Sequence, residues 1–175
     1  MDRKTIQWHE QTEWLHGALT GSGAFLVVNT PAVRANPMTI GWGMVGIAWG
    51  MPLFVALVRR SRYTYECIQN VASFVVSVPR IGELQEALAL CGTRSGRDID
   101  KIAAAGLTVA PAQEVDTPIL ADCGLHYECE IVARTQQLHS DFASQQILET
   151  VYQQADNHHQ AVFGKILSAY TTKDA

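Results

Sequence analysis

Six short apolar segments, rich in β-branched and aromatic residues, are distributed along almost the whole chain. Each has the length and composition of a buried or half-buried strand, and each is bounded by glycine, proline or polar residues. This succession predicts a mainly β fold, an antiparallel barrel with short helices between its strands. The segments are residues 23–29, 38–49, 52–58, 73–78, 125–135 and 161–170.

The connections between these segments have short helical patterns, and residues 107–109 indicate one more brief strand. A parallel βαβ sheet is the alternative architecture. It has little support, because no strand-to-helix turn contains G-x-G-x-x-G, and the Gly21-Ser22-Gly23 run precedes a strand. The helical patterns cover residues 63–70, 81–90 and 98–105, a less regular one covers 141–155, and residues 1–16 are expected to form a polar lead-in or short helix.

The composition and charge exclude several classes of protein. With 175 residues, 47% of them hydrophobic, the chain has enough material for one compact domain spanning residues 1–175. Its net charge of −4 argues against a nucleic-acid partner. No window holds the roughly 20 uncharged apolar residues of a membrane span, and the N-terminus lacks the apolar core of a signal peptide, so we expect a cytoplasmic protein. The four cysteines form no C-x-x-C pair, so neither a metal site nor a disulfide framework is expected.

Two cationic segments stand out in this acidic chain. In residues 91–107, CGTRSGRDIDKIAAAGL, a glycine-containing turn precedes a helix that Asp98 can cap and Gly106 can close. The backbone N–H groups of the turn, beside Arg97 and Lys101, can hold a phosphate. The alternative is a capped surface helix whose charges are solvated.

The second cationic segment, VRRSRYTYE, covers residues 58–66 and directly follows the apolar strand 52–58. It places three arginines at the start of a helix that Ser61 can cap. Guanidinium groups and free N–H groups converge there, which is typical of an anion site. Each segment alone is a weak signal, but together they favour a bound anion.

With these segments in place, the chain resembles the flavin reductase-like family of FMN-binding split barrels, which includes flavoredoxin. The resemblance spans roughly residues 17–170 and its motifs occur in the family's order. These motifs are NPMTIGW (36–42), VRRSRYTYE (58–66), FVVSVP (74–79), CGTRSGRDIDK (91–101), AGLT (105–108), HYECEI (126–131) and FGKI (163–166).

The resemblance implies a split-barrel homodimer with one FMN per subunit near the interface. The loop of residues 36–42 would wrap the isoalloxazine and ribityl chain, and the two cationic segments would hold the phosphate. His159 would correspond to the histidine that precedes the family's phenylalanine-glycine pair. The implied cofactor-binding residues are Asn36, Met38, Thr39, Ile40, Trp42, Arg59, Ser61, Arg62, Tyr63, Thr64, Ser95, Lys101 and His159.

Taken alone, several of these residues have simpler explanations. Trp42 can be a core indole, and Asn36 a turn residue before proline. Lys101 can pair with a helix carboxylate such as Asp98. His159 follows an Ala-Asp-Asn-His run that is typical of an exposed turn. Only the family motifs turn these residues into candidates for a flavin site.

The resemblance implies an FMN-dependent oxidoreductase that takes a hydride from NADH or NADPH onto flavin N5. No protein residue is expected to be catalytic, because the flavin carries the redox chemistry. The alternative is a flavoredoxin-like electron carrier reduced by a partner protein, and a flavin-binding module without turnover also stays open. Residues 137–157 match the family poorly and are expected to form a variable lid.

Overall fold

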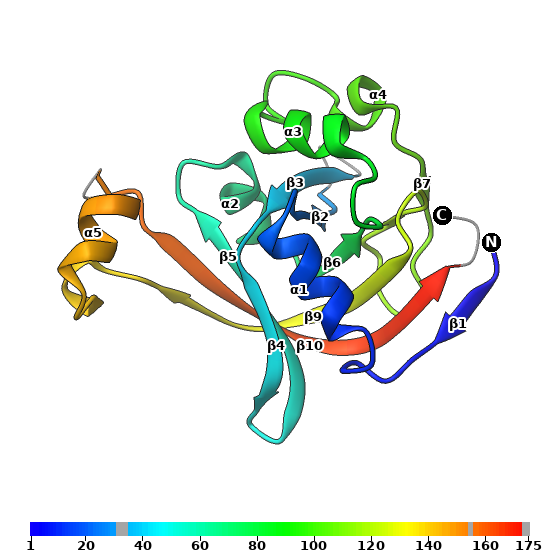
Figure 1. Ribbon diagram of the computed structural model, residues 1–175, viewed down its shortest axis with the longest axis horizontal. Coiled ribbons are helices and arrows are strands. Elements are labelled where there is room, and N and C mark those ends of the chain that lie inside the picture. Colours follow the sequence, from blue (N-terminus) through cyan, green and yellow to red (C-terminus); the bar gives the residue numbers. More distant parts are fainter. Residues whose placement is uncertain (31–34, 154–155, 173–175) are drawn as a thin grey trace.

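The computed structural model describes residues 1–30, 35–153 and 156–172, and an antiparallel sheet of eight strands forms its body (Figure 1). The strand order is β3-β2-β6-β9-β10-β5-β4, and β1 pairs with the far end of β10. This arrangement confirms the predicted mainly β class. The strands are β1 (Arg3–Thr5), β2 (Ala24–Val28), β3 (Asn36–Ile40), β4 (Gly43–Ala48), β5 (Met51–Arg59), β6 (Ser73–Val78), β9 (Leu125–Gln136) and β10 (His159–Thr172), and a separate small sheet pairs β7 (Val109–Ala110) with β8 (Ile119–Leu120).

The sheet curls because its two edge strands are neighbours in the sequence. The apolar run 38–49, predicted as one segment, breaks at Gly41 and Trp42 into β3 and β4, which stand at opposite ends of the strand order. Gly43 follows the break in close contact with β5, where an added Cβ would lie 3.1 Å from the carbonyl oxygen of Val55. The glycines therefore mark the sharp crossover that closes the barrel.

The barrel interior is filled by aromatic side chains from three strands. Phe54 packs against both Phe74 and Tyr127, with ring centroids 6.3 Å and 5.6 Å away. Gly164 on β10 leaves the space for this cluster, since a Cβ there would lie 2.5 Å from the Phe74 ring. A second apolar cluster, which includes Phe25 and Leu88, joins the other face of the sheet to the helices.

The helices are short and lie between the strands, as predicted. They are α1 (Thr12–Thr20), α2 (Tyr63–Ile68), α3 (Gln85–Thr93), α4 (Lys101–Ala105) and α5 (Gln145–Val151), with a 3₁₀ turn η1 (His139–Asp141). The helix expected over 81–90 begins later, because Gly82 and Leu84 have φ angles of 88° and 52° that an α-helix does not accept. Residues 1–16 hold β1 and the start of α1.

Two predicted helix caps are wrong. Asp100, not Asp98, caps α4: its carboxylate accepts hydrogen bonds from the backbone N–H groups of Ile102 and Ala103 at 2.9 Å and 3.2 Å. Gly106 ends this helix with φ 63°, as predicted. Ser61 does not cap α2, because the helix begins one residue later and Arg62 occupies its N-cap position without a side-chain bond.

The strands β9 and β10 run on beyond the barrel and carry α5 at their far end, as a projecting arm (Figure 1, left). The described residues of the segment 137–157, which exclude 154 and 155, lie in this arm. In the described part of the chain, no helix combines the length and apolarity that crossing a bilayer requires.

Candidate functional site

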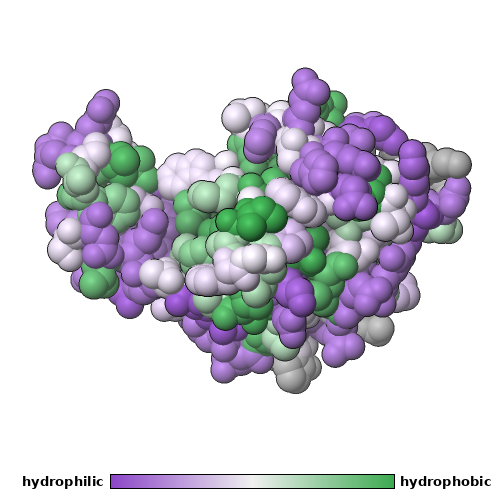
Figure 2. Space-filling view, turned by 90° about the horizontal axis from the view of Figure 1, so that it is seen from below, coloured by the Kyte–Doolittle hydropathy of each residue, from purple (hydrophilic) through white to green (hydrophobic). Residues whose placement is uncertain are grey.

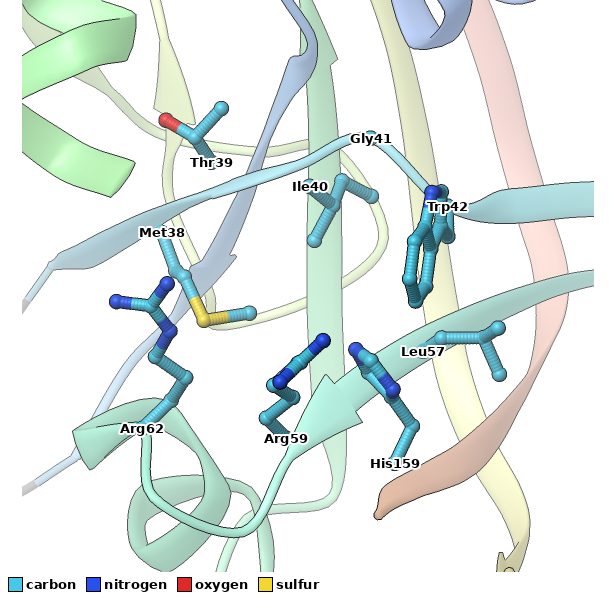
Figure 3. Close-up of a pocket in the computed structure, with 9 residues that line it drawn as sticks. All are labelled: Met38, Thr39, Ile40, Gly41, Trp42, Leu57, Arg59, Arg62 and His159. Carbon is cyan, nitrogen blue, oxygen red and sulfur yellow. The ribbon is translucent and has the colours of Figure 1, made fainter. Parts of the chain in front are cut away.

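A cavity of about 190 Å³ opens where the β3–β4 crossover meets the ends of β5 and β10 (Figure 3). The crossover and the end of β3 supply one wall, and four side chains from β5, the β5–α2 turn and β10 supply the other. Arg59 and His159 are directly opposite each other in the antiparallel pairing of β5 with β10, so segments far apart in sequence meet here. The lining residues are Met38, Thr39, Ile40, Gly41, Trp42, Leu57, Arg59, Arg62 and His159.

His159 lies at the cavity wall with an almost fully buried side chain. The hydroxyl of Tyr152 is 2.7 Å from Nδ1 of His159, and the Trp42 indole packs against the imidazole with ring centroids 4.8 Å apart. Burial, and then the positive charges of Arg59 and Arg62, lower the pKa of His159 from 6.5 to about 4. The imidazole is therefore neutral at neutral pH and offers hydrogen bonds instead of charge.

Both arginines are held in place by backbone carbonyls. Nη2 of Arg59 donates to the carbonyl of Val151 at 3.1 Å, and its guanidinium lies 5.6 Å from the centroid of the Tyr152 ring. Nη1 of Arg62 donates to the carbonyl of Gly92 at 2.8 Å, which ties it to α3. A guanidinium has five N–H donors, so these contacts leave each fork able to bind an anion.

Seven of the thirteen residues predicted for the site line this cavity: Met38, Thr39, Ile40, Trp42, Arg59, Arg62 and His159. Two lining residues were missed, Gly41 and Leu57. Leu57 precedes Arg59 by two positions on β5, so strand periodicity places both on one face and could have identified it. Gly41 is within the predicted loop and next to Trp42.

Four other predicted residues form a cluster beside the cavity. Asn36 and Thr64 are buried, and Nδ2 of Asn36 donates to Oγ1 of Thr64 at 2.9 Å. The turn that contains Ser95 lies directly over them, because a Cβ at Gly96 would collide with Oδ1 of Asn36 and the ring of Tyr63. This Oδ1 is buried and has no hydrogen-bond partner among the residues that the structure describes.

Lys101 and Ser61 are placed differently from the expectation. Lys101 is buried, and its Nζ donates to the carbonyls of Pro37 and Cys91 at 2.9 Å and 3.1 Å, so it ties β3 to α3 instead of lining the cavity. Burial lowers the pKa of Lys101. Ser61 is exposed, and its backbone N–H donates to Oδ1 of Asn157.

The cationic turn of residues 94–97 is a surface feature in this structure. Arg97 forms an ion pair with Glu66, both side chains being largely exposed, and its guanidinium lies over the Tyr63 ring. This agrees with the alternative of solvated surface charge for that arginine. The arginines of the second segment, Arg59 and Arg62, are those that reach the cavity.

The chemistry of the cavity suits an aromatic ligand that carries an anion. The Trp42 indole and the neutral His159 ring offer flat surfaces, and the two guanidinium groups offer charge-assisted hydrogen bonds. A flavin nucleotide has both an aromatic ring system and a phosphate, so these residues fit one. The described residues contain no group of three or more His, Cys, Asp or Glu side chains that could hold a metal ion.

Comparisons with known proteins agree with this fold. The flavoredoxin of Methanosarcina acetivorans superimposes with a TM-score of 0.65 at 26% identity, over 86% of this chain and 68% of that one. The nitrilotriacetate monooxygenase component B of Bacillus cereus gives a TM-score of 0.67 at 17% identity, over 97% and 82%. These matches confirm the predicted split-barrel fold.

A sequence relative from Pyrococcus abyssi, itself an uncharacterized protein, is 29% identical over 108 residues, which are 61% of this chain. The match spans 60% of the relative's own length. The model of the flavin reductase like domain matches residues 18–175, nearly the whole chain. The chain therefore belongs to the flavin reductase-like domain family.

Proposed function

We propose that the protein binds FMN in this cavity and acts as an NAD(P)H:flavin reductase-type oxidoreductase. The observation that carries the proposal is the meeting of Trp42, neutral His159 and two fixed guanidinium groups at one cavity of a flavin reductase-like domain. A bound flavin supplies the hydride and electron chemistry, from a nicotinamide to its N5 atom. That chemistry explains why binding and orienting groups suffice here.

Each lining group has a distinct part in this proposal. Arg59 and Arg62 bind the phosphate, since guanidinium forks match its geometry and charge. The backbone of residues 38–42 contacts the polar edge of the flavin ring system. Trp42 and His159 exclude water from the face of that ring system. His159 makes its hydrogen bond as a neutral group, which keeps additional positive charge away from the ring.

We also propose that the working form is a homodimer. Large apolar side chains project from the β4–β5 hairpin, whose first strand begins one residue after Trp42: Met44, Ile47 and Trp49 are 53%, 63% and 64% exposed. Figure 2 shows apolar side chains gathered on the face toward which this hairpin points. Exposed apolar groups of this kind are typical of an interaction surface.

The size of the cavity supports the same proposal. Its 190 Å³ in one chain is below the roughly 300–1,000 Å³ of small-molecule sites. A second copy on the hairpin face, related by a two-fold axis, would deepen the cavity from its open side.

The test is to titrate the purified protein with FMN and mix the yellow complex with NADH or NADPH under anaerobic conditions. Rapid bleaching of the flavin absorbance supports the reductase. A yellow complex that dithionite reduces but neither pyridine nucleotide does would instead indicate an electron carrier served by a partner protein. A protein that binds no FMN in the titration would contradict both the reductase and the carrier.

A further inference from the structure

The arm meets the cavity through the residues that follow α5. Three aromatic rings pack together at its root: Phe142 stacks on His158 with centroids 5.6 Å apart, and Tyr152 lies 4.8 Å from His158. From this cluster, the Tyr152 hydroxyl and the Val151 carbonyl contact His159 and Arg59, which line the cavity. The end of α5 therefore touches both the imidazole and one guanidinium of the proposed flavin site.

Either group can donate in the contact between Tyr152 and His159, and the length of the contact favours the hydroxyl as donor. Its length of 2.7 Å is typical of an O–H donor, whereas N–H donors usually lie nearer 2.9–3.0 Å. The second contact of the hydroxyl, with Oε1 of Gln137, is 3.3 Å long and weaker. The two lengths together favour the hydroxyl as donor to Nδ1. A neutral imidazole has one N–H, so its proton is then on Nε2.

We propose that Tyr152 is a positioning residue: its hydroxyl fixes His159 as the Nε2–H tautomer, so that the ring presents a hydrogen-bond donor to the ligand. The matching ligand group is an acceptor, such as a carbonyl oxygen or an unprotonated ring nitrogen of an isoalloxazine. The identity of this ligand rests on the proposed function, but the tautomer does not. The arm thereby sets which hydrogen bond the cavity makes.

The test uses Tyr152→Phe, which keeps the ring that packs on Phe142, His158 and Arg59 and removes only the hydroxyl. Tyr127→Phe is the matched control, because Tyr127 is fully buried and its hydroxyl has no hydrogen-bond partner in the described part of the chain. The tautomer is measured by ¹⁵N–¹H NMR on histidine-labelled protein without flavin, with His159→Gln to assign the signal. We expect Nε2–H in the unmodified protein and in Tyr127→Phe, and a mixture of tautomers in Tyr152→Phe.

An Nδ1–H signal for His159 in the unmodified protein would overturn the proposal, and so would a Tyr152→Phe spectrum equal to that of the unmodified protein. The first result does not need Tyr152→Phe, so it holds even if that variant does not fold. FMN affinity provides the second readout: Tyr152→Phe should weaken FMN about five- to tenfold, the effect of one neutral hydrogen bond. Adding Tyr152→Phe to His159→Gln should then cause no further loss.

The two proposals fail in different ways. If the unmodified protein shows the Nε2–H tautomer, lost in Tyr152→Phe, but binds no FMN, the positioning role stands and the proposed function is wrong. If FMN binds but its affinity and the tautomer are the same in Tyr152→Phe, the proposed function stands and the positioning role is wrong.

Discussion

Arg59 and His159 face each other across the β5–β10 pair, and the charge of the arginine helps to keep the histidine neutral. Directly opposed residues of an antiparallel pair place their side chains on the same face of the sheet. One wall of the cavity thus combines a permanent cation with a neutral donor. This pairing separates the two tasks of the proposed site, anion binding and contact with an uncharged ring.

The anion-binding task leads to the first prediction. Arg59→Gln should weaken FMN binding by about ten- to a hundredfold, the effect of losing one charge-assisted contact, and should weaken riboflavin much less because riboflavin has no phosphate. Arg60→Gln is the matched control, since Arg60 is the adjacent arginine, exposed and outside the cavity lining. Fluorescence titration with both flavins measures the affinities. Equal losses for FMN and riboflavin would show that Arg59 does not contact the phosphate.

For Lys101 we predict an effect on stability and no effect on phosphate binding. Because Nζ donates to the carbonyls of Pro37 and Cys91, Lys101→Met should lower the free energy of unfolding by about 1–3 kcal/mol, the cost of buried acceptors left unpaired. The ratio of FMN to riboflavin affinity should not change. Urea unfolding and the two flavin titrations check this. A loss confined to FMN would mean that the ammonium group reaches the phosphate after all.

A pH-dependent stability follows from His126. Its Nε2–H donates to the Cys123 carbonyl at 2.9 Å, and its Nδ1 accepts from the Ser77 hydroxyl at 3.1 Å, so the buried ring is neutral. Burial lowers its pKa to about 4, below the ordinary 6.5. Between these values the unfolded chain binds more protons than the folded one, so stability is present above pH 6.5 and is lost as the pH falls toward 4.

The size of this loss can be measured. Two and a half pKa units correspond to a loss of about 3 kcal/mol at most for His126, and His159 changes stability in the same direction. His126→Gln should be less stable at pH 7 but lose less between pH 7 and pH 5. Urea unfolding at both pH values tests this. If His126→Gln loses as much unfolding free energy between pH 7 and pH 5 as the unmodified protein does, the role of His126 is refuted.

The hairpin face provides a prediction on assembly. Ile47→Glu places a charge within the exposed apolar hairpin, so it should convert a dimer into a monomer and weaken FMN binding. Ile81→Glu is the control, because Ile81 is 73% exposed and lies against Gly17, away from the hairpin. Light scattering with a parallel FMN titration distinguishes them. Dimers that survive Ile47→Glu would place the interface elsewhere.

The strands were predictable because they depend on local patterns, whereas the residues of the cavity wall were predicted only through the resemblance to the family. Alternating apolar residues marked β9 and β10 within two residues or so of their ends. The break of the run 38–49 into β3 and β4 was not predicted. Helix starts were less predictable. Asp98 and Asp100 are both suitable caps in sequence, and only the path of the chain after Ser95 decides between them.

The side-chain partners of the site depended on contacts that no local pattern encodes. Lys101 looked like a surface cation, but the packing of α3 against β3 encloses it with two carbonyls. His159 looked like part of an exposed turn, but the arm folds Tyr152 over it. The arm could not be predicted, because its position depends on how far β9 and β10 extend as a pair beyond the barrel.

Anaerobic stopped-flow mixing of the FMN-loaded protein with NADH and, separately, NADPH shows whether the protein is a flavin reductase. We predict that FMN binding depends on both arginines of the cavity, Arg59 and Arg62. We also predict that one of the two nucleotides bleaches the flavin absorbance rapidly. The same bleaching should be slow in Arg59→Gln at equal FMN concentration, because less cofactor is bound. Failure to bind FMN, or a bound flavin that only dithionite reduces, would contradict the account of this protein as a reductase.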